Sequence, residues 1–172
     1  LFLGVSIGSV FTIYEPLDPS VYSLGGIFLA LVMIIVAKFY HKILNAYYFF
    51  RISILVELIV LAMLVSFLIF SYSYQTALFI YIGYQITFVF GSYLVRAETL
   101  VFNDNEVLTK IYMAKQISYL VGMDISYLFY KGLEYYELIL DKQEQVYNIH
   151  FILVAIELSV LYFLIRAFTK TD

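Results

Sequence analysis

Residues 54–70 read ILVELIVLAMLVSFLIF and contain one charged residue, Glu57. A block of this length and composition is typical of a helix inside a lipid bilayer, where a span requires about 20 mostly apolar residues. Similar blocks recur along the chain, and the one at residues 25–37, GGIFLALVMIIVA, carries no charge at all. The sequence therefore predicts an integral membrane protein.

The composition of the whole chain agrees with this prediction. Apolar residues make up 63 % and charged residues 13 %, whereas soluble domains have about 45–50 % and about 25 %. A β-barrel would show segments of about ten residues with alternating polarity, and these blocks do not alternate. Helices satisfy their own backbone hydrogen bonds in lipid. The predicted fold class is an all-α, polytopic membrane helix bundle.

Breaks between the apolar blocks predict six transmembrane helices in one domain that covers residues 1–172. Both prolines lie in EPLDPS at residues 15–20 and separate the first two helices. Asn103 or Asp104 is expected to cap the helix that follows NDNE, and Gly4 and Gly8 have the spacing of a close helix contact. The predicted helices are 1–13, 21–40, 46–70, 76–102, 108–136 and 146–168.

Basic residues sort to alternate loops of this arrangement. Lysine and arginine favour cytoplasmic loops, and eight of the ten basic residues fall on the side of the second and fourth loops; the exceptions are Lys131 and Lys142. This distribution predicts six spans with both termini in the cytoplasm, and the expected location is a bacterial inner (plasma) membrane. Tryptophan is absent, so tyrosines are expected to form the aromatic belt.

Polar residues inside the predicted spans are the candidates for function, because they are costly in lipid. Helix 76–102 has a polar stripe on one face. The stripe is interpreted either as a wall of a solute path or as a set of hydrogen bonds between helices. Its members are Tyr81, Gln85, Ser92, Arg96 and Thr99.

Helix 108–136 has polar residues on two opposite faces. Lys115 begins one of them, and Asp124 lies on the other near the middle of the membrane. A carboxyl group in an apolar setting favours its neutral form, so Asp124 is predicted to carry a proton or a cation; the alternative is an acid held by a neighbouring tyrosine. Glu57, Glu157 and His150 are open to either cation binding or pairing with another chain.

Other classes of function are not indicated. No nucleophile with a histidine partner and no phosphate-binding loop is visible, so the chain is not expected to be an enzyme. His41 and His150 fall on opposite membrane sides in the predicted topology and cannot share a metal. The net charge is −3, and cysteine is absent. Neither a cofactor nor a nucleic-acid partner is predicted.

Residues 96–130, RAETLVFNDNEVLTKIYMAKQISYLVGMDISYLFY, resemble the end of the fourth helix, the next loop and the fifth helix of major facilitator superfamily transporters. The counterparts of the family pattern are Ala97, Glu98, Leu100, Phe102 and Asp104. The family's amino-terminal half also has six helices with both ends inside. The resemblance implies that the first and fourth helices line a path and that the third and sixth face lipid or a partner.

The same resemblance implies a gate at the inner face. The segment AKFYHKILN at residues 37–45 keeps Lys38, His41 and Lys42 at the place of the family's basic loop, and Glu98 is expected to attract Lys38 or Lys42. Family members have two six-helix halves, and this chain corresponds to one. The predicted partners are therefore the lipid bilayer, a small-molecule or ion substrate, and a second six-helix half or a second copy.

Two functions follow as hypotheses. The first is a secondary transporter, or half of one, that moves a small solute by alternating access, with proton coupling through Asp124. The second is a non-transporting subunit of a larger membrane complex, in which the acids serve as docking points. Solute uptake into proteoliposomes would favour the first hypothesis, and copurification with stoichiometric partners would favour the second.

Overall fold

The chain is helical throughout the part that the computed structural model describes, which comprises residues 1–10, 17–136, 139 and 141–169. No strand occurs in these residues, so the predicted all-α class is confirmed. In chain order the helices are α1 (Phe2–Val10), α2 (Pro19–Lys38), α3 (Tyr40–Ile43), α4 (Ala46–Ile69), α5 (Tyr74–Phe102), α6 (Asn105–Tyr135) and α7 (Lys142–Thr169).

The observed helix ends agree with the predicted ones to within a few residues. Asp104 caps α6, because its carboxylate accepts hydrogen bonds from the backbone N–H groups of Glu106 and Val107 at 2.8 and 3.3 Å. The helix therefore begins three residues before the predicted start. Pro19 is the first residue of α2, a position that needs no backbone N–H donor. Residues 11–13 of the first predicted helix and the break at residues 15–16 lie outside the described residues.

Four described helices, α2, α4, α5 and α7, are long and apolar enough to cross a membrane, which makes the chain a multi-pass membrane protein. The nine residues of α1 cover about 14 Å, about half of a bilayer core. The 31 residues of α6 are long enough to span, but this helix is less apolar than the other four.

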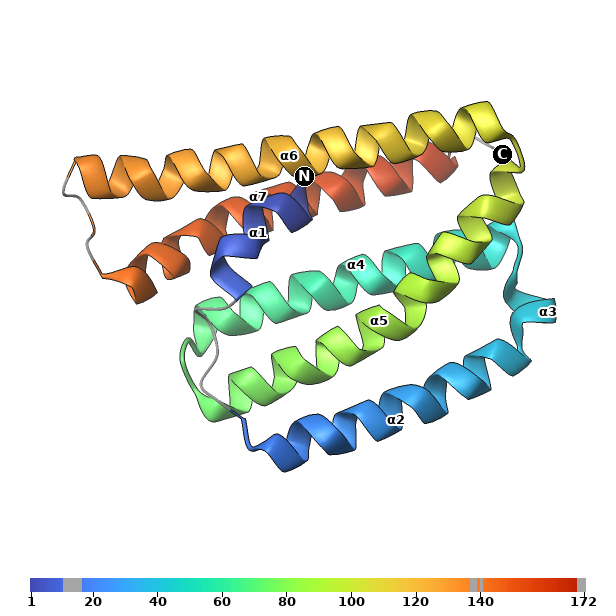
Figure 1. The fold of residues 1–172 in the computed structure, drawn as a ribbon, viewed down its shortest axis with the longest axis horizontal. Helices are drawn as coiled ribbons and strands as arrows, with labels where there is room; N and C mark the ends of the chain where they lie inside the picture. Colours follow the sequence, from blue (N-terminus) through green and yellow to red (C-terminus); the bar gives the residue numbers. More distant parts are fainter. Residues whose placement is uncertain (11–16, 137–138, 140, 170–172) are drawn as a thin grey trace.

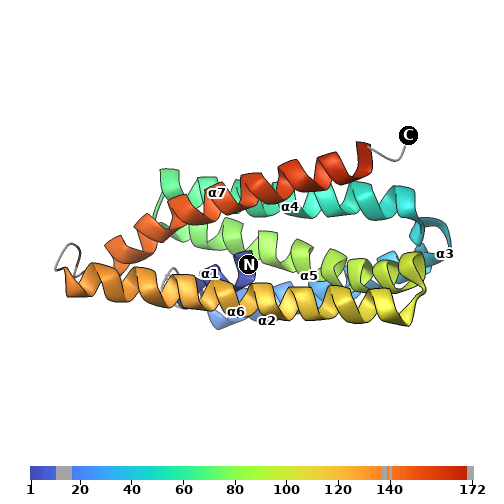
Figure 2. The same cartoon turned by 90° about the horizontal axis from the view of Figure 1, so that it is seen from above.

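The long helices run side by side in two layers (Figure 1). Figure 2 shows α4 and α7 in one layer and α1, α2 and α6 in the other, with α5 between them. The α2–α4 connection with α3, the turn between α5 and α6, and the end of α7 lie at one end of the bundle. The turn between α4 and α5 and the start of α7 lie at the other end.

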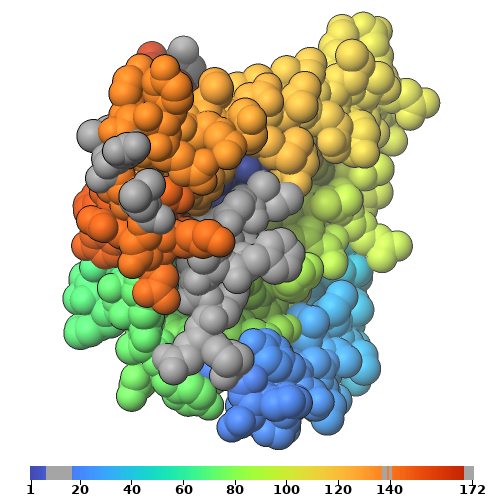
Figure 3. All heavy atoms as spheres, turned by 60° about the vertical axis from the view of Figure 1, so that its left-hand side comes forward, coloured from blue at the N-terminus to red at the C-terminus, as the bar shows by residue number. Residues whose placement is uncertain are grey.

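The principal helix contacts join α1 to α6, α4 to α5, α4 to α7, α2 to α5, and α1 to α7. Two buried apolar clusters lie at the α4–α7 interface. The first contains Val5, Leu64, Ile149 and Leu153, and the second contains Met63, Phe67, Ile80 and Val146. None of the residues of α2 is buried, and Figure 3 shows this helix at the opposite side of the bundle from α6.

The contact between α1 and α6 depends on glycine. A Cβ atom added to Gly122 would lie about 3.0 Å from the Cα of Gly4 and the N of Val5, which are backbone atoms of α1. A Cβ atom added to Gly4 would likewise meet the backbone of α6 at Tyr119, Gly122 and Met123. The predicted close packing at Gly4 is therefore confirmed, and the surroundings of Gly8 lie outside the described side chains.

Tyr93 ties the middle of α5 to the end of α3. Its side chain is fully buried, and its hydroxyl donates a hydrogen bond to the backbone carbonyl of Ile43 at 2.6 Å. We expect Tyr93→Phe to lower the free energy of unfolding by about 0.5–1.5 kcal/mol, the net contribution of one hydrogen bond, because the Ile43 carbonyl keeps a second partner in the backbone N–H of Asn45 at 2.8 Å. Unfolding in detergent micelles measures this change. The exposed Tyr135 provides the control, and an equal effect of Tyr135→Phe would contradict the explanation.

Candidate solute-contact surface and a buried carboxyl pair

The polar stripe of α5 divides into two parts in the structure. In the first part, the Tyr81 hydroxyl donates to the backbone carbonyl of Tyr22 in α2 at 3.1 Å, and the two rings meet edge to face at 5.1 Å between centroids. Gly25 makes room for the Tyr81 ring. Gln85 is half-buried, and its Oε1 atom has no hydrogen-bond partner among the described residues. Tyr81 therefore joins helices, as the second interpretation predicted.

The second part of the stripe, Ser92, Arg96 and Thr99, is exposed and lines an open, shallow pocket of about 510 Å³. Met33 of α2 and Tyr40 of α3 complete its wall with Val95 and Leu100. The guanidinium carbon of Arg96 lies 5.5 Å from the centroid of the Tyr40 ring, a geometry in which the ring face attracts the cation. This surface therefore offers one positive charge, two hydroxyl groups and an aromatic wall.

Glu98 pairs with Lys115 of α6 at 2.5 Å, and its side chain is only 16 % exposed. This ion pair bridges α5 and α6 near the turn that joins them. The expected attraction of Glu98 to Lys38 or Lys42 is thus replaced, because α6 brings Lys115 closer. Lys42 lies near the Phe39 ring instead, at 6.0 Å from its centroid.

Asp124 lies on the exposed side of α6. Gly122 and Ser126 are buried on the other side, where α6 packs against α1, and 200° of helix rotation separates Asp124 from Gly122. Lys131, on the same side as Asp124, forms an ion pair with Glu134 at 2.7 Å. Among the described residues, no tyrosine hydroxyl or cation contacts the Asp124 carboxylate. The structure therefore does not join Asp124 to the α5 surface within this chain.

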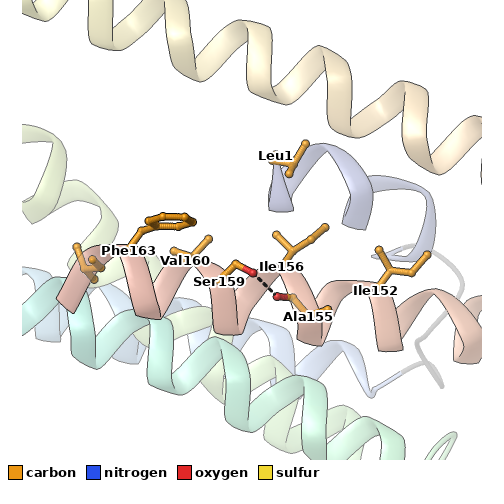
Figure 4. Close-up of a pocket in the computed structure, with 8 residues that line it drawn as sticks. Leu1, Ile152, Ala155, Ile156, Ser159, Val160 and Phe163 are labelled. Carbon is orange, nitrogen blue, oxygen red and sulfur yellow. Dashed lines mark hydrogen bonds between the residues drawn. The ribbon is translucent and has the colours of Figure 1, made fainter. Parts of the chain in front are cut away.

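A larger hollow of about 690 Å³ lies beside α7 (Figure 4). Its wall is almost entirely apolar and includes Leu1, Ile152, Ile156 and Phe163. The hydroxyl of Ser159 donates within its own helix to the carbonyl of Ala155 at 2.8 Å. Because the side chains that line it offer few polar groups, this hollow fits the acyl chain of a lipid better than a polar solute.

Glu57 and Glu157 meet at the interface of α4 and α7. The helices run antiparallel (Figure 1), with Phe67 against His150 on one side of the two acids and Phe50 against Phe168 on the other, at 4.1 and 4.4 Å between centroids, and this register places Glu57 beside Glu157. Neither carboxyl oxygen of Glu157 has a hydrogen-bond partner among the described residues. Glu157 is 1 % exposed, and Glu57 is half-buried. The sequence marks each acid as unusual, but only the packing of α4 on α7 makes them a pair.

The His150 side chain contacts Phe67 and Val146 rather than the two acids. Its ring packs on Phe67 with 4.1 Å between centroids, and its Nδ1 lies 2.6 Å from the carbonyl oxygen of Val146. Near this cluster, the hydroxyl of Tyr72 donates to the carbonyl of Gln143. Burial and the nearby Asp141 raise the pKa of Tyr72, which keeps the donor protonated. Tyr72 therefore connects the α4–α5 turn to α7, beyond the anchoring role predicted for tyrosines.

Comparisons with known proteins identify no relative of this chain, so its function is inferred from its own sequence and structure. No protein-family model matches the chain, and neither the curated proteins nor the solved structures contain a match.

Proposed function

We propose that this chain is a six-helix unit of a secondary transporter, which moves a small solute by alternating access against a second six-helix unit. The solute is contacted by the exposed surface of α5 around Arg96. The second unit is either another half of the same kind or a second copy. The resemblance of residues 96–130 to major facilitator superfamily transporters points to the same function.

The observation that carries the proposal is an approximate internal symmetry among the principal helix contacts. When α1, α2 and α4 are taken as one triplet and α5, α6 and α7 as the next, the contact of α1 with α6 corresponds to that of α5 with α2. The contact of α4 with α5 likewise corresponds to that of α7 with α1, and the contact of α4 with α7 maps onto itself. Repeats of three helices, nested in a six-helix half, are characteristic of these transporters.

Exposed polar groups on two helices give further support. Arg96 on α5 and Asp124 on α6 are exposed within this chain, yet charged groups at membrane depth face a bundle interior or a water-filled cavity. A second unit with a hydrated path between the two would provide that environment. The mixed polar character of α6, which is the least apolar of the long helices, has the same explanation.

The charge distribution supports an orientation. The end of the bundle that holds α3 and the turn between α5 and α6 is flanked by most of the basic residues, and this end is expected to face the cytoplasm. The end of α7 lies on that side, and the six-span topology predicts that the first span also begins there. The ion pair of Glu98 with Lys115 then lies at the inner face, where it holds α5 and α6 together.

The test is uptake of labelled organic anions, sugars and amino acids into proteoliposomes under an imposed proton gradient. Once a solute is found, we expect Arg96→Ala to reduce uptake by about tenfold or more, since a hydrogen bond to a charged group contributes about 1.5–3 kcal/mol. The control is Arg51→Ala, because Arg51 also stacks on a tyrosine, with 4.3 Å to the Tyr47 centroid, but lies on α4. Equal losses in both variants would contradict the assignment of the α5 surface.

Proton coupling is tested separately with Asp124→Asn. We expect this variant to lose gradient-driven accumulation while it keeps exchange of solute across the membrane, because only the coupling group changes. Asp141→Asn, outside the long spans, is the control. Unchanged gradient-driven uptake in Asp124→Asn would remove Asp124 from the mechanism.

A second function, a non-transporting subunit of a membrane complex, is favoured by one observation. No residue of α2 is buried, and large apolar side chains such as Ile27, Phe28 and Leu31 are more than half exposed. A partner protein on α2 would cover them, as would lipid. Stoichiometric copurification of another membrane protein, together with absence of uptake for every solute, would favour this function.

A further inference from the structure

The Glu57 and Glu157 pair lies far from both membrane surfaces. Glu57 is 11 residues from the start of α4, or about 17 Å along its axis, and Glu157 is 12 residues from the end of α7, or about 18 Å. Both helices are among the four that are long and apolar enough to span a membrane. The pair therefore lies near the middle of the bilayer, where a charge is most costly.

The buried carboxyl group of Glu157 lies beside a second carboxyl group, that of Glu57. Its carboxyl oxygens are shielded from solvent and have no hydrogen-bond partner in regular geometry among the described residues. Glu57, across the α4–α7 interface, is the acidic group that lies beside it. A buried polar group without a partner is destabilising, so the carboxyl group of Glu157 points to a ligand that the protein itself does not supply.

The surrounding helices bring no compensating cation to the pair. The described side chains of α1 include no ionisable group, and the residues that α5 and α6 add to the clusters beside α4 and α7 include the phenols of Tyr84 and Tyr130. His150 lies seven residues from Glu157 on α7, about 10.5 Å away along the axis. It is held by Phe67 and Val146.

Two ionised carboxylates near the middle of an apolar helix bundle would repel each other strongly, because a low-dielectric interior screens charge poorly. One bound proton removes a negative charge and allows one carboxyl O–H to donate to the other carboxylate, which is a short and strong kind of hydrogen bond. A metal ion fits less well, since hard cations take six or more oxygen ligands and no third acidic or histidine side chain joins the pair among the described residues.

We propose that Glu57 and Glu157 form a proton-binding site that holds at least one proton while α4 and α7 are packed together. The proton lies between the two carboxyl groups and passes to water when the helices separate. The site thereby couples the proton concentration to the stability of the α4–α7 interface. It does not depend on the solute or on Asp124, so it stands independently of the proposed transport function.

The first experiment measures the apparent unfolding temperature of the intact, detergent-solubilised chain across a series of pH values. We expect the wild type to lose stability as the pH rises, because loss of the shared proton restores repulsion between α4 and α7. A proton affinity that differs tenfold between the folded and unfolded states changes the unfolding equilibrium constant tenfold. We expect the unfolding equilibrium constant of the wild type to rise at least tenfold over the pH series. Glu157→Gln, which keeps the size of the side chain, removes this loss.

Glu144→Gln is the matched control, since Glu144 lies on the exposed first turn of α7. It should keep the pH dependence of the wild type. Should Glu157→Gln fail to fold, Glu57→Gln removes the same repulsion from the other helix and gives the same expectation. A wild-type loss of stability that persists unchanged in both Glu157→Gln and Glu57→Gln would overturn the proposal.

The second experiment observes the proton itself. Infrared spectra of the folded wild type at neutral pH should contain a stretching band of a protonated carboxyl group, and this band should be absent from the Glu57→Gln/Glu157→Gln double variant and present in Glu144→Gln. A wild type without such a band, or a double variant that retains it in full, would overturn the proposal whether or not the chain transports a solute.

Discussion

Gly122→Ala is expected to separate α1 from α6 and to destabilise the bundle. A methyl group at this position would meet the backbone of α1, with the Cα of Gly4 and the N of Val5 at about 3.0 Å. Backbone atoms cannot move aside by a change of rotamer, so the helices themselves must shift. Overpacking usually costs about 1–3 kcal/mol, and we expect the upper end of this range or more, as measured by unfolding in detergent.

Gly132→Ala on the same helix is the control. A Cβ atom there has nothing within 4 Å, and alanine is the better helix former by about 1 kcal/mol. The two substitutions are therefore expected to have opposite signs, although the chemical change is identical. A stabilising effect of Gly122→Ala, equal to that of Gly132→Ala, would show that α1 does not pack as closely as described.

Phe67→Ala should destabilise the α4–α7 interface by about 3–5 kcal/mol, the range for loss of a buried aromatic side chain. The Phe67 ring is 1 % exposed and packs against the rings of His150 and Tyr72, at 4.1 and 5.3 Å between centroids. Its removal leaves a cavity beside the buried imidazole and between three helices. The apparent free energy of unfolding measures the loss.

Phe88→Ala serves as the comparison, because the Phe88 side chain on α5 is 63 % exposed. Only a small change is expected there, since lipid or detergent replaces the lost contacts. Near-equal effects of the two substitutions would mean that Phe67 is not part of a packed core. The same pair of variants also distinguishes an effect on the interface from an effect of aromatic content alone.

The class of the protein follows from sequence because the bilayer acts on each segment separately. The apolar block that contains Glu57 must be helical in lipid whatever lies beside it, and local signals such as Asp104 fix where the next helix begins. Helix positions were therefore predicted to within a few residues. The contact of Gly4 was predicted for the same reason, since the absence of a side chain is visible in the sequence.

The candidate site was predicted only in part. The stripe of α5 shares one helical face by periodicity, but whether its members meet α2, as Tyr81 does, or remain exposed, as Arg96 does, depends on where α2 lies. The ion pair of Glu98 with Lys115 of α6 was not predicted for a similar reason. The positions of the lysines are known from sequence, and their distances to Glu98 are not.

By itself, the sequence determined a helical membrane protein, the positions of its helices and the unusual acids within them, because hydropathy and capping act over a few residues. Only the tertiary structure decided that Glu57 lies beside Glu157, that Asp124 lies on an exposed side, and that the principal helix contacts correspond between the two triplets. These features depend on which helices pack together, and that choice rests on side-chain fit between segments up to about 100 residues apart, which no local pattern encodes.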